Sequence, residues 1–211
     1  LDENQLENSG LESLCRGLAY SQNLKRLSLK ANDITCSDGL AMLVHRSMLQ
    51  MLSLSENAIG GDAGAKRLGI SLLMSKPRDV ASRRLHDDRP RNCGHCPAGG
   101  CLRELSLSNN LVSDTTGARA LCELLISTTT RMERLDLSSC GITDTTLAEL
   151  VAHLYKDGRP LSLQELCLSF NSIGNAGLQH VAAMLSRKHC TLSSLGVQFN
   201  DFDSLECIEE A

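Results

Sequence analysis

The sequence predicts an α/β solenoid in which a short strand, a turn and a helix repeat along the chain and stack on one another. Five matched positions recur six times in the 211 residues, and the first complete copy is Leu24, Leu27, Leu29, Asn32 and Ile34. Leucines between the copies recur at three- and four-residue spacing, which is the periodicity of a helix face. Aromatic residues make up only 2% of the chain. Its core must therefore consist of aliphatic layers, which suits stacked repeats.

The repeated pattern reads L-x-x-L-x-L-x-x-N-x-h, where h is apolar. Its motif Asn, replaced once by Cys, falls at Asn32, Asn57, Asn110, Cys140, Asn171 and Asn200. A truncated copy opens the chain with Leu1, Asn4 and Leu6. Leucines at alternate strand positions should point into the core, so the x positions face outward. We expect the Asn side chain to satisfy backbone groups of the turn that follows it, because that turn is buried between repeats.

The segments between the copies are predicted to be helices. The last two apolar faces consist of Leu147, Leu150, Val151 and Leu154, and of Leu178, Val181, Ala182 and Leu185.

This pattern resembles the leucine-rich-repeat family, in particular its ribonuclease-inhibitor-like class. Residues 171–178 match the N-x-h-G-x-x-G-h form of that class closely. The resemblance covers nearly the whole chain outside residues 76–99. It implies a right-handed horseshoe with a parallel sheet on the concave side and helices on the convex side.

One insertion is expected to interrupt a single solenoid. Residues 1–75 are predicted to hold repeats, the first of them truncated, and residues 100–211 to continue the same solenoid. Between them, residues 76–99 are predicted to form an inserted loop, because this stretch is rich in Pro, Gly and basic residues.

The insertion also raises the question of a metal site. Cys93, Cys96, Cys101 and His86 could supply four zinc ligands, and two Cys separated by two residues are a common half-site. No second C-x-x-C and no H-x₃₋₅-H pattern accompanies them. We favour a loop of reduced cysteines, and we predict no cofactor for the chain.

Charge and composition argue against several function classes. The net charge is −4 and the pI is about 5.9, unlike the basic surface of a nucleic-acid binder. No apolar run reaches the roughly 18 residues of a membrane span. Most cysteines occur singly at repeat positions, and no N-glycosylation acceptor is present. We therefore expect reduced thiols and an intracellular, cytoplasmic protein.

The outward positions show no catalytic set, because no His shares that register with Cys167 and a Cys nucleophile needs a base. We predict that the chain is not an enzyme and that a small-molecule substrate is unlikely. The outward register instead favours a protein partner. The predicted partner-binding residues are Phe170, Phe199, Arg134, Asp136, Glu165, Ser138 and Ser169.

The two phenylalanines of this set each precede a motif Asn and are one repeat apart, so they should be exposed on neighbouring strands, with Arg134 and Glu165 as a polar rim. The alternative is that Phe170 and Phe199 are packing residues, covered by further repeats or by residues 203–211. Phe202, by contrast, should point into the core.

The predicted function is a non-enzymatic protein–protein interaction module of a larger intracellular scaffold, regulator or receptor. The resemblance leaves one alternative open, a GTPase-activating protein or another enzyme regulator similar to the Ran GTPase-activating protein.

Deleting residues 78–98 should leave the repeats folded, because shortening a long surface loop costs little free energy. Circular dichroism and thermal unfolding of the shortened chain would measure this. Loss of soluble, helical protein would show instead that the insertion packs on the solenoid or carries a structural metal.

Overall fold

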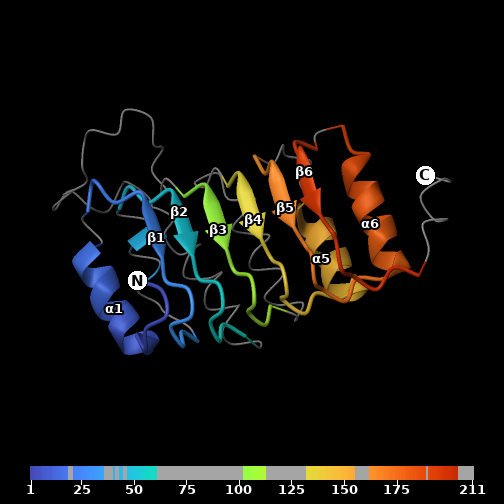
Figure 1. The fold of residues 1–211 in the computed structure, drawn as a ribbon. Coiled ribbons are helices and arrows are strands. Elements are labelled where there is room, and N and C mark those ends of the chain that lie inside the picture. Colours follow the sequence, from blue (N-terminus) through green and yellow to red (C-terminus); the bar gives the residue numbers. More distant parts are fainter. Residues whose placement is uncertain are drawn as a thin grey trace, which may run out of the picture.

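The protein is described here from a computed structural model, which covers residues 1–18, 21–35, 40, 43–44, 47–60, 102–112, 132–154, 162–188 and 190–203. Six strands form one parallel sheet in chain order (Figure 1). The strands are β1 (Arg26–Ser28), β2 (Met51–Ser53), β3 (Glu104–Ser106), β4 (Arg134–Asp136), β5 (Glu165–Cys167) and β6 (Ser194–Gly196). This arrangement confirms the predicted leucine-rich-repeat solenoid.

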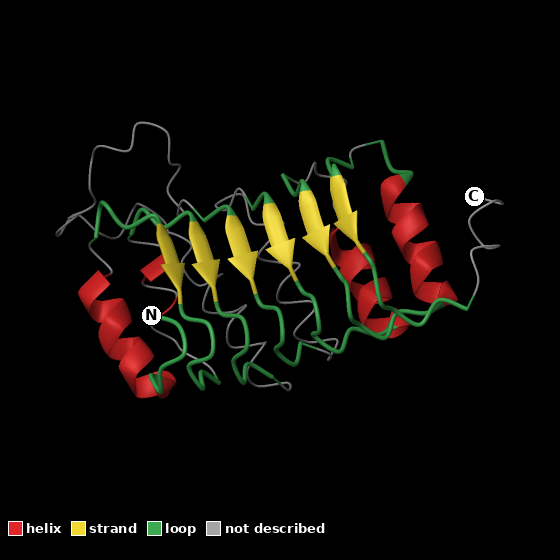
Figure 2. Ribbon diagram, in the orientation of Figure 1, coloured by secondary structure: helices red, strands yellow, loops and turns green. Residues whose placement is uncertain are grey.

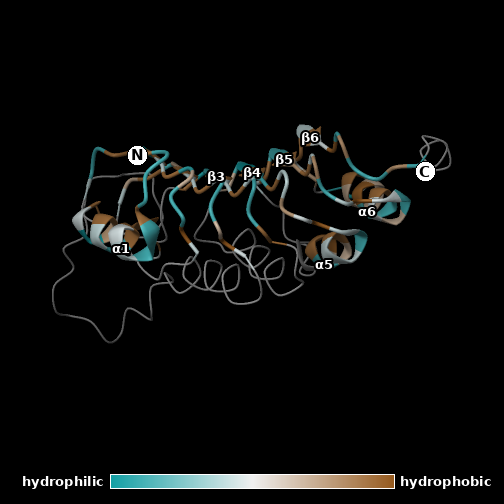
Figure 3. Cartoon of the chain, turned by 60° about the horizontal axis from the view of Figure 1, so that its bottom comes forward, coloured by the Kyte–Doolittle hydropathy of each residue, from teal (hydrophilic) through white to brown (hydrophobic). Residues whose placement is uncertain are grey.

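The described helices all lie on one side of this sheet (Figures 2 and 3). They are α1 (Glu7–Leu18), α5 (Asp144–Leu154) and α6 (Asn175–Leu185). We call the opposite side of the sheet the open face. Within the described ranges, every helix is too short or too polar to cross a bilayer.

The core lies between the sheet and the helices, where the strand leucines predicted to point inward are buried. The central leucine of each of the first five strands is at most 6% exposed. On β6, the central leucine, Leu195, is only half-buried. Phe202, which follows β6 in the chain, is also half-buried and packs against the core as expected.

The buried stripe of α6 differs from the predicted one. Leu185 is 46% exposed, whereas Met184 is 2% exposed and packs inward with Gly177 and Val181. The apolar periodicity allowed both phases, because Met184 and Leu185 are adjacent in the helix, and Met184 is the one that belongs to the core.

The N-terminus of α6 explains the glycines of the repeat motif. The backbone N–H of Gly174 donates to the Asp144 carboxylate, with the Gly174 N 2.7 Å from Oδ1. That carboxylate from the preceding repeat also lies favourably against the positive end of the α6 dipole. A Cβ on Gly177 would collide with the same Asp144 oxygen and with the side chain of Ile173, so any larger residue would force these side chains to move.

A left-handed turn follows each strand. The residue just before the motif Asn, or before Cys140 in the fourth copy, has a positive φ in every complete copy. The φ angle is 52° at Ala31, 54° at Glu56 and Asn109, 53° at Ser139, 58° at Phe170 and 57° at Phe199. This conformation is unfavourable for residues other than glycine. In the first five copies the N–H of the turn residue donates to a carbonyl of the next repeat, as when Phe170 donates to the Gln198 carbonyl at 2.8 Å, and this bond holds the turn in place.

The motif asparagines join each repeat to the one before it. Asn171 Oδ1 accepts the backbone N–H groups of Cys140 and Ile142 at 2.9 and 3.0 Å. Its Nδ2 donates to the carbonyls of Leu137 at 3.0 Å and Leu168 at 2.8 Å. The expectation that the Asn serves the turn that follows it was therefore wrong. Its side chain points back along the stack, so it satisfies the turn of the preceding repeat.

Cys140 replaces only part of this function. Its buried Sγ lies 3.2 Å from the carbonyl oxygen of Leu107 and 3.5 Å from that of Ser138, and its single S–H can donate to either one. Burial raises the pKa of the Cys140 thiol to about 12, so it remains a protonated donor at neutral pH.

Leu137→Ala should lower the free energy of unfolding by about 2–5 kcal/mol, because the fully buried Leu137 side chain would leave a cavity. Urea unfolding monitored by circular dichroism would measure the change. Leu111→Ala is the matched control, since Leu111 is 56% exposed and its removal should change stability little. Equal unfolding curves for the two variants would contradict the assigned register.

Candidate functional site

Three outward positions in each repeat build the open face. The first row, in strand register, is Arg26, Met51, Glu104, Arg134, Glu165 and Ser194. The second row is Ser28, Ser53, Ser106, Asp136, Cys167 and Gly196. The third row, two residues further along each chain segment, is Lys30, Ser55, Ser108, Ser138, Ser169 and Gln198. Asp136 and Cys167 are thus direct neighbours on β4 and β5.

The first row carries a short charged ladder. Arg134 lies between two glutamates on the adjacent strands, with its Nη1 3.3 Å from Glu104 and its Nε 3.0 Å from Glu165. These side chains are about half exposed, so the pairs contribute little to stability. They do orient the guanidinium, and they leave this row with more negative than positive charge on β3 to β5.

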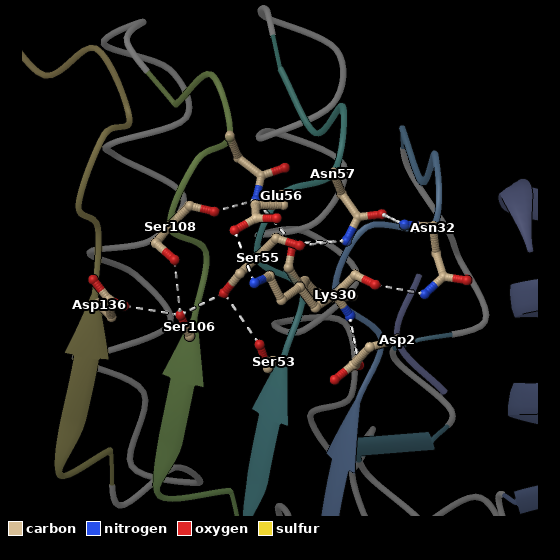
Figure 4. A network of polar contacts seen from close by, with 12 residues as sticks. Asp2, Lys30, Asn32, Ser53, Ser55, Glu56, Asn57, Ser106, Ser108 and Asp136 are labelled. Carbon is tan, nitrogen blue, oxygen red and sulfur yellow. Dashed lines mark hydrogen bonds and ion pairs between the residues drawn. The ribbon is translucent and has the colours of Figure 1, made fainter. Parts of the chain in front are cut away.

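The carboxylate of Asp136 organises the second and third rows. Its Oδ1 accepts hydrogen bonds from the Ser138 hydroxyl at 2.6 Å and from the Ser138 N–H at 3.0 Å. Its Oδ2 accepts one from the Ser106 hydroxyl at 3.0 Å (Figure 4). Ser106 in turn lies 2.8 Å from the hydroxyl of Ser55, which lies 3.1 Å from that of Ser53.

The same chain of polar contacts continues toward the C-terminal repeats. The Ser138 hydroxyl lies 3.0 Å from the Cys167 sulfur, which lies 3.4 Å from the hydroxyl of Ser169. Ser169 donates to Gln198 Oε1 at 2.6 Å. The contacts from Ser53 to Gln198 therefore cross five strands without interruption. Such a network holds its side chains in fixed positions before any partner arrives.

A shallow hollow covers the open face from β2 to β6. Its lining includes Glu104, Arg134, Asp136, Glu165 and Gln198. Its acidic groups outnumber its single Arg, so the hollow carries net negative charge.

Phe170 and Phe199 lie side by side at one edge of the open face. Their ring centroids are 4.4 Å apart and their planes meet at 14°, so the rings are stacked. Phe170 is 56% exposed and Phe199 is 73% exposed. The predicted exposure and adjacency are confirmed. Both residues lie in the left-handed turns beyond β5 and β6 rather than on the strands, because the strands end three residues earlier.

The structure separates the predicted partner-binding residues into two groups. Arg134 and Glu165 begin their strands, whereas the phenylalanines follow the strand ends, so the charged pair does not form a rim around the rings. Ser169 is only 5% exposed, so it supports the face from below. Sequence reasoning missed Gln198, which precedes Phe199 in the chain, accepts a hydrogen bond from Ser169 and occupies the same outward position as Ser169.

The possible zinc ligands and the histidines do not lie on the described part of the open face. Cys93, Cys96, Cys101 and His86 lie outside the described residues. The histidines within the described ranges, His153 and His180, belong to α5 and α6 on the opposite side of the sheet from Cys167.

Comparison with known proteins agrees with this architecture. A family model described as "Leucine Rich repeat" matches residues 130–151 and 160–182. Ribonuclease inhibitor of Sus scrofa is 32% identical over 94% of this chain and 44% of its own length. The Mus musculus ribonuclease inhibitor is 30% identical, over 98% of this chain and 46% of its own length. NACHT, LRR and PYD domains-containing protein 3 of Bos taurus is 28% identical over 99% of this chain and 21% of its own length.

The repeated strand, asparagine turn and helix define a leucine-rich-repeat solenoid. The comparisons narrow this class, and the chain is a leucine-rich-repeat protein of the ribonuclease-inhibitor-like class. It spans less than half the length of the ribonuclease inhibitors that it matches.

Gly196→Ala should destabilise the fold by about 1–3 kcal/mol, because overpacking forces neighbouring atoms to shift. A Cβ on Gly196 would lie 2.8 Å from the Cys167 sulfur. In a Cys167→Ala background the same substitution should cost less, since the clashing atom is gone. Urea unfolding of the unsubstituted chain, the two single variants and the double variant would measure the coupling free energy between the two positions. If the two single effects simply add, the close packing of Gly196 against Cys167 is contradicted.

Proposed function

We propose that this chain is a non-enzymatic protein-interaction module of a larger intracellular scaffold, regulator or receptor. It binds a protein partner through the C-terminal half of the open face and the adjacent phenylalanines. The observation that carries this proposal is the stacked, exposed pair of Phe170 and Phe199 beside a preorganised polar surface.

The pair is suited to anchor a partner. Aromatic residues are enriched among the side chains that supply most of the free energy of protein association. Exposed apolar groups that adjoin one another, rather than being scattered, often mark interaction sites. Stacking also fixes the two rings, so less conformational entropy is lost when a partner binds.

The polar surface beside the rings supplies specificity. Asp136, Arg134 and Glu165 are held by neighbours on adjacent strands, so their charges are presented at fixed places. Complementary charges govern the choice and the association rate of a partner more than its affinity.

The relatives support a module of this kind. The ribonuclease inhibitors are named for acting on another protein, and the NACHT, LRR and PYD proteins are named for several domains, of which the LRR part is one. We also propose that the protein is intracellular and cytoplasmic. This is supported by the four described cysteines, none of which forms a disulfide: Cys15, Cys140, Cys167 and Cys190.

The proposal also excludes a nucleic acid, a membrane and a small-molecule substrate as the main ligand. The exclusion of nucleic acid rests on the net charge of −4 and on the acidic hollow of the open face, which would repel a polyanion.

Phe170→Ala combined with Phe199→Ala should abolish partner binding and leave the fold intact. Alanine fits the left-handed turn, because Ala31 occupies the equivalent position with a φ of 52°. The test is a quantitative pull-down with the full-length protein, paired with thermal unfolding. Losing two anchors should weaken binding by roughly 2 kcal/mol or more for each anchor.

Leu111→Ala serves as the matched control, since Leu111 is 56% exposed, like Phe170, but lies three repeats before Phe199. If the double variant still binds the partner but has a lowered melting temperature, the proposed binding site is wrong. In that case the two rings would be packing residues.

A further inference from the structure

The charges at the start of the strands are distributed unevenly along the open face. We call the first residue of each strand, together with the residue before it, the start margin. From β1 to β6 the start margin consists of Lys25 and Arg26, Gln50 and Met51, Arg103 and Glu104, Glu133 and Arg134, Gln164 and Glu165, and Ser193 and Ser194. Its charge is therefore positive at β1 and absent at β2, and it becomes negative at β5.

The positive charge at β1 is not neutralised by neighbouring side chains. Lys25 and Arg26 are exposed, and neither forms an ion pair within the part of the chain that the structure describes. Lys30, beyond the other end of β1, differs in this respect. Its Nζ lies 3.0 Å from Glu56, and its N–H donates to the Asp2 carboxylate (Figure 4). The excess positive charge of this repeat therefore lies at the start margin.

Carboxylates outnumber basic groups from β3 to β5. Arg134 is paired on both sides, and the Nη1 of Arg103 lies 2.6 Å from Glu133. Asp136, in the second row beside them, accepts its hydrogen bonds from neutral donors. Three glutamates and Asp136 thus face two arginines, which leaves a net charge of −2 on these three strands. The hollow of the open face lies over the same strands.

We propose that the open face binds a segment of the protein partner with acidic residues at one end and basic residues at the other. The acidic end lies over β1 and the basic end over β3 to β5. This inference rests on the proposed function, extends its surface to the N-terminal repeats, and fixes the direction in which the partner lies.

Spacing and charge together define this segment. Strands about 4.8 Å apart place β1 about 14 Å from β4, which is the length of about ten residues of helix. In the proposed direction opposite charges meet at both ends, whereas in the reversed direction like charges meet at both ends. Complementary charges of this kind fix the register and direction of a partner more than they raise its affinity.

The binding test uses two fluorescein-labelled helical peptides of equal composition, built from alanine, glutamine, three glutamates and three lysines. In the block peptide the glutamates and the lysines are grouped about ten residues apart, and in the alternating peptide they are interspersed. Fluorescence anisotropy with the full chain should show about five- to thirty-fold tighter binding of the block peptide, the effect of a few exposed ion pairs. Equal affinities, or no binding of the block peptide, would overturn the proposal.

A matched pair of variants ties this preference to the start margin. Lys25→Glu combined with Arg26→Glu should bring the ratio of the two affinities close to one. Arg187→Glu combined with Lys188→Glu changes the net charge equally, and these residues are also adjacent and exposed, but they follow α6 on the opposite side of the sheet (Figure 2). This control should keep the preference. Equal loss in both variants would trace it to net charge and contradict the proposal.

Photo-crosslinking measures the direction of binding. A benzophenone at the acidic end of the block peptide should label the repeat of β1, and one at the basic end should label the repeats of β4 and β5. Mass spectrometry of the crosslinked chain identifies the labelled residues. Exchanged sites, or the same sites from both ends, would show that the charges do not direct the segment.

The two proposals fail in different ways. If the double phenylalanine variant loses the partner but the block and alternating peptides bind alike, the interaction site stands and the charge assignment is wrong. If the block peptide is preferred but the double variant still binds the partner, the charge assignment stands and the phenylalanine anchor is wrong.

Discussion

The buried turn after each strand is the constraint on which the rest of the solenoid depends. Its N–H groups are shut away from water, and the motif asparagine of the next repeat is placed to accept them, as Asn171 does for Cys140 and Ile142. A repeat therefore completes its own hydrogen bonds only when its neighbour is in register. The stability of the solenoid therefore depends on contacts between neighbouring repeats. These contacts are the asparagine hydrogen bonds and the leucine layers that the two repeats bury together.

The same turn frees one position per repeat for recognition. The residue before the asparagine keeps a φ between 52° and 58° whether it is Ala31, Glu56, Ser139 or Phe170. Because one backbone conformation accepts such different side chains, the fold does not require an aromatic residue there. The backbone therefore leaves this position free for the role proposed above, in which two successive phenylalanines anchor a partner.

Leucine alternation was enough to predict the strand register, because a period of two leaves only one way to bury the strand. The exposure of the phenylalanines was predicted instead from their position just before the motif Asn, since strict alternation from Leu166 and Leu168 would turn Phe170 inward. Apolar periodicity was not enough for α6, where Met184 and Leu185 offer two phases of one helical stripe. The direction of the asparagine side chains and the link from Ser169 to Gln198 also escaped prediction. Both depend on the offset between stacked repeats and on side-chain torsions, which no single repeat encodes.

Crowding decides where on the open face a partner finds large side chains. Parallel strands lie about 4.8 Å apart, so the middle rows hold serines, a cysteine and a glycine that bond or pack closely with one another. At Gly196 even one extra carbon would collide with Cys167. Asp136 and Gln198 are larger groups within these rows, whereas Arg134 and Glu165 begin their strands at one margin and Phe170 and Phe199 lie in the turns at the other. In the proposed function, a partner that contacts both margins would lie across the small, polar and internally bonded surface between them.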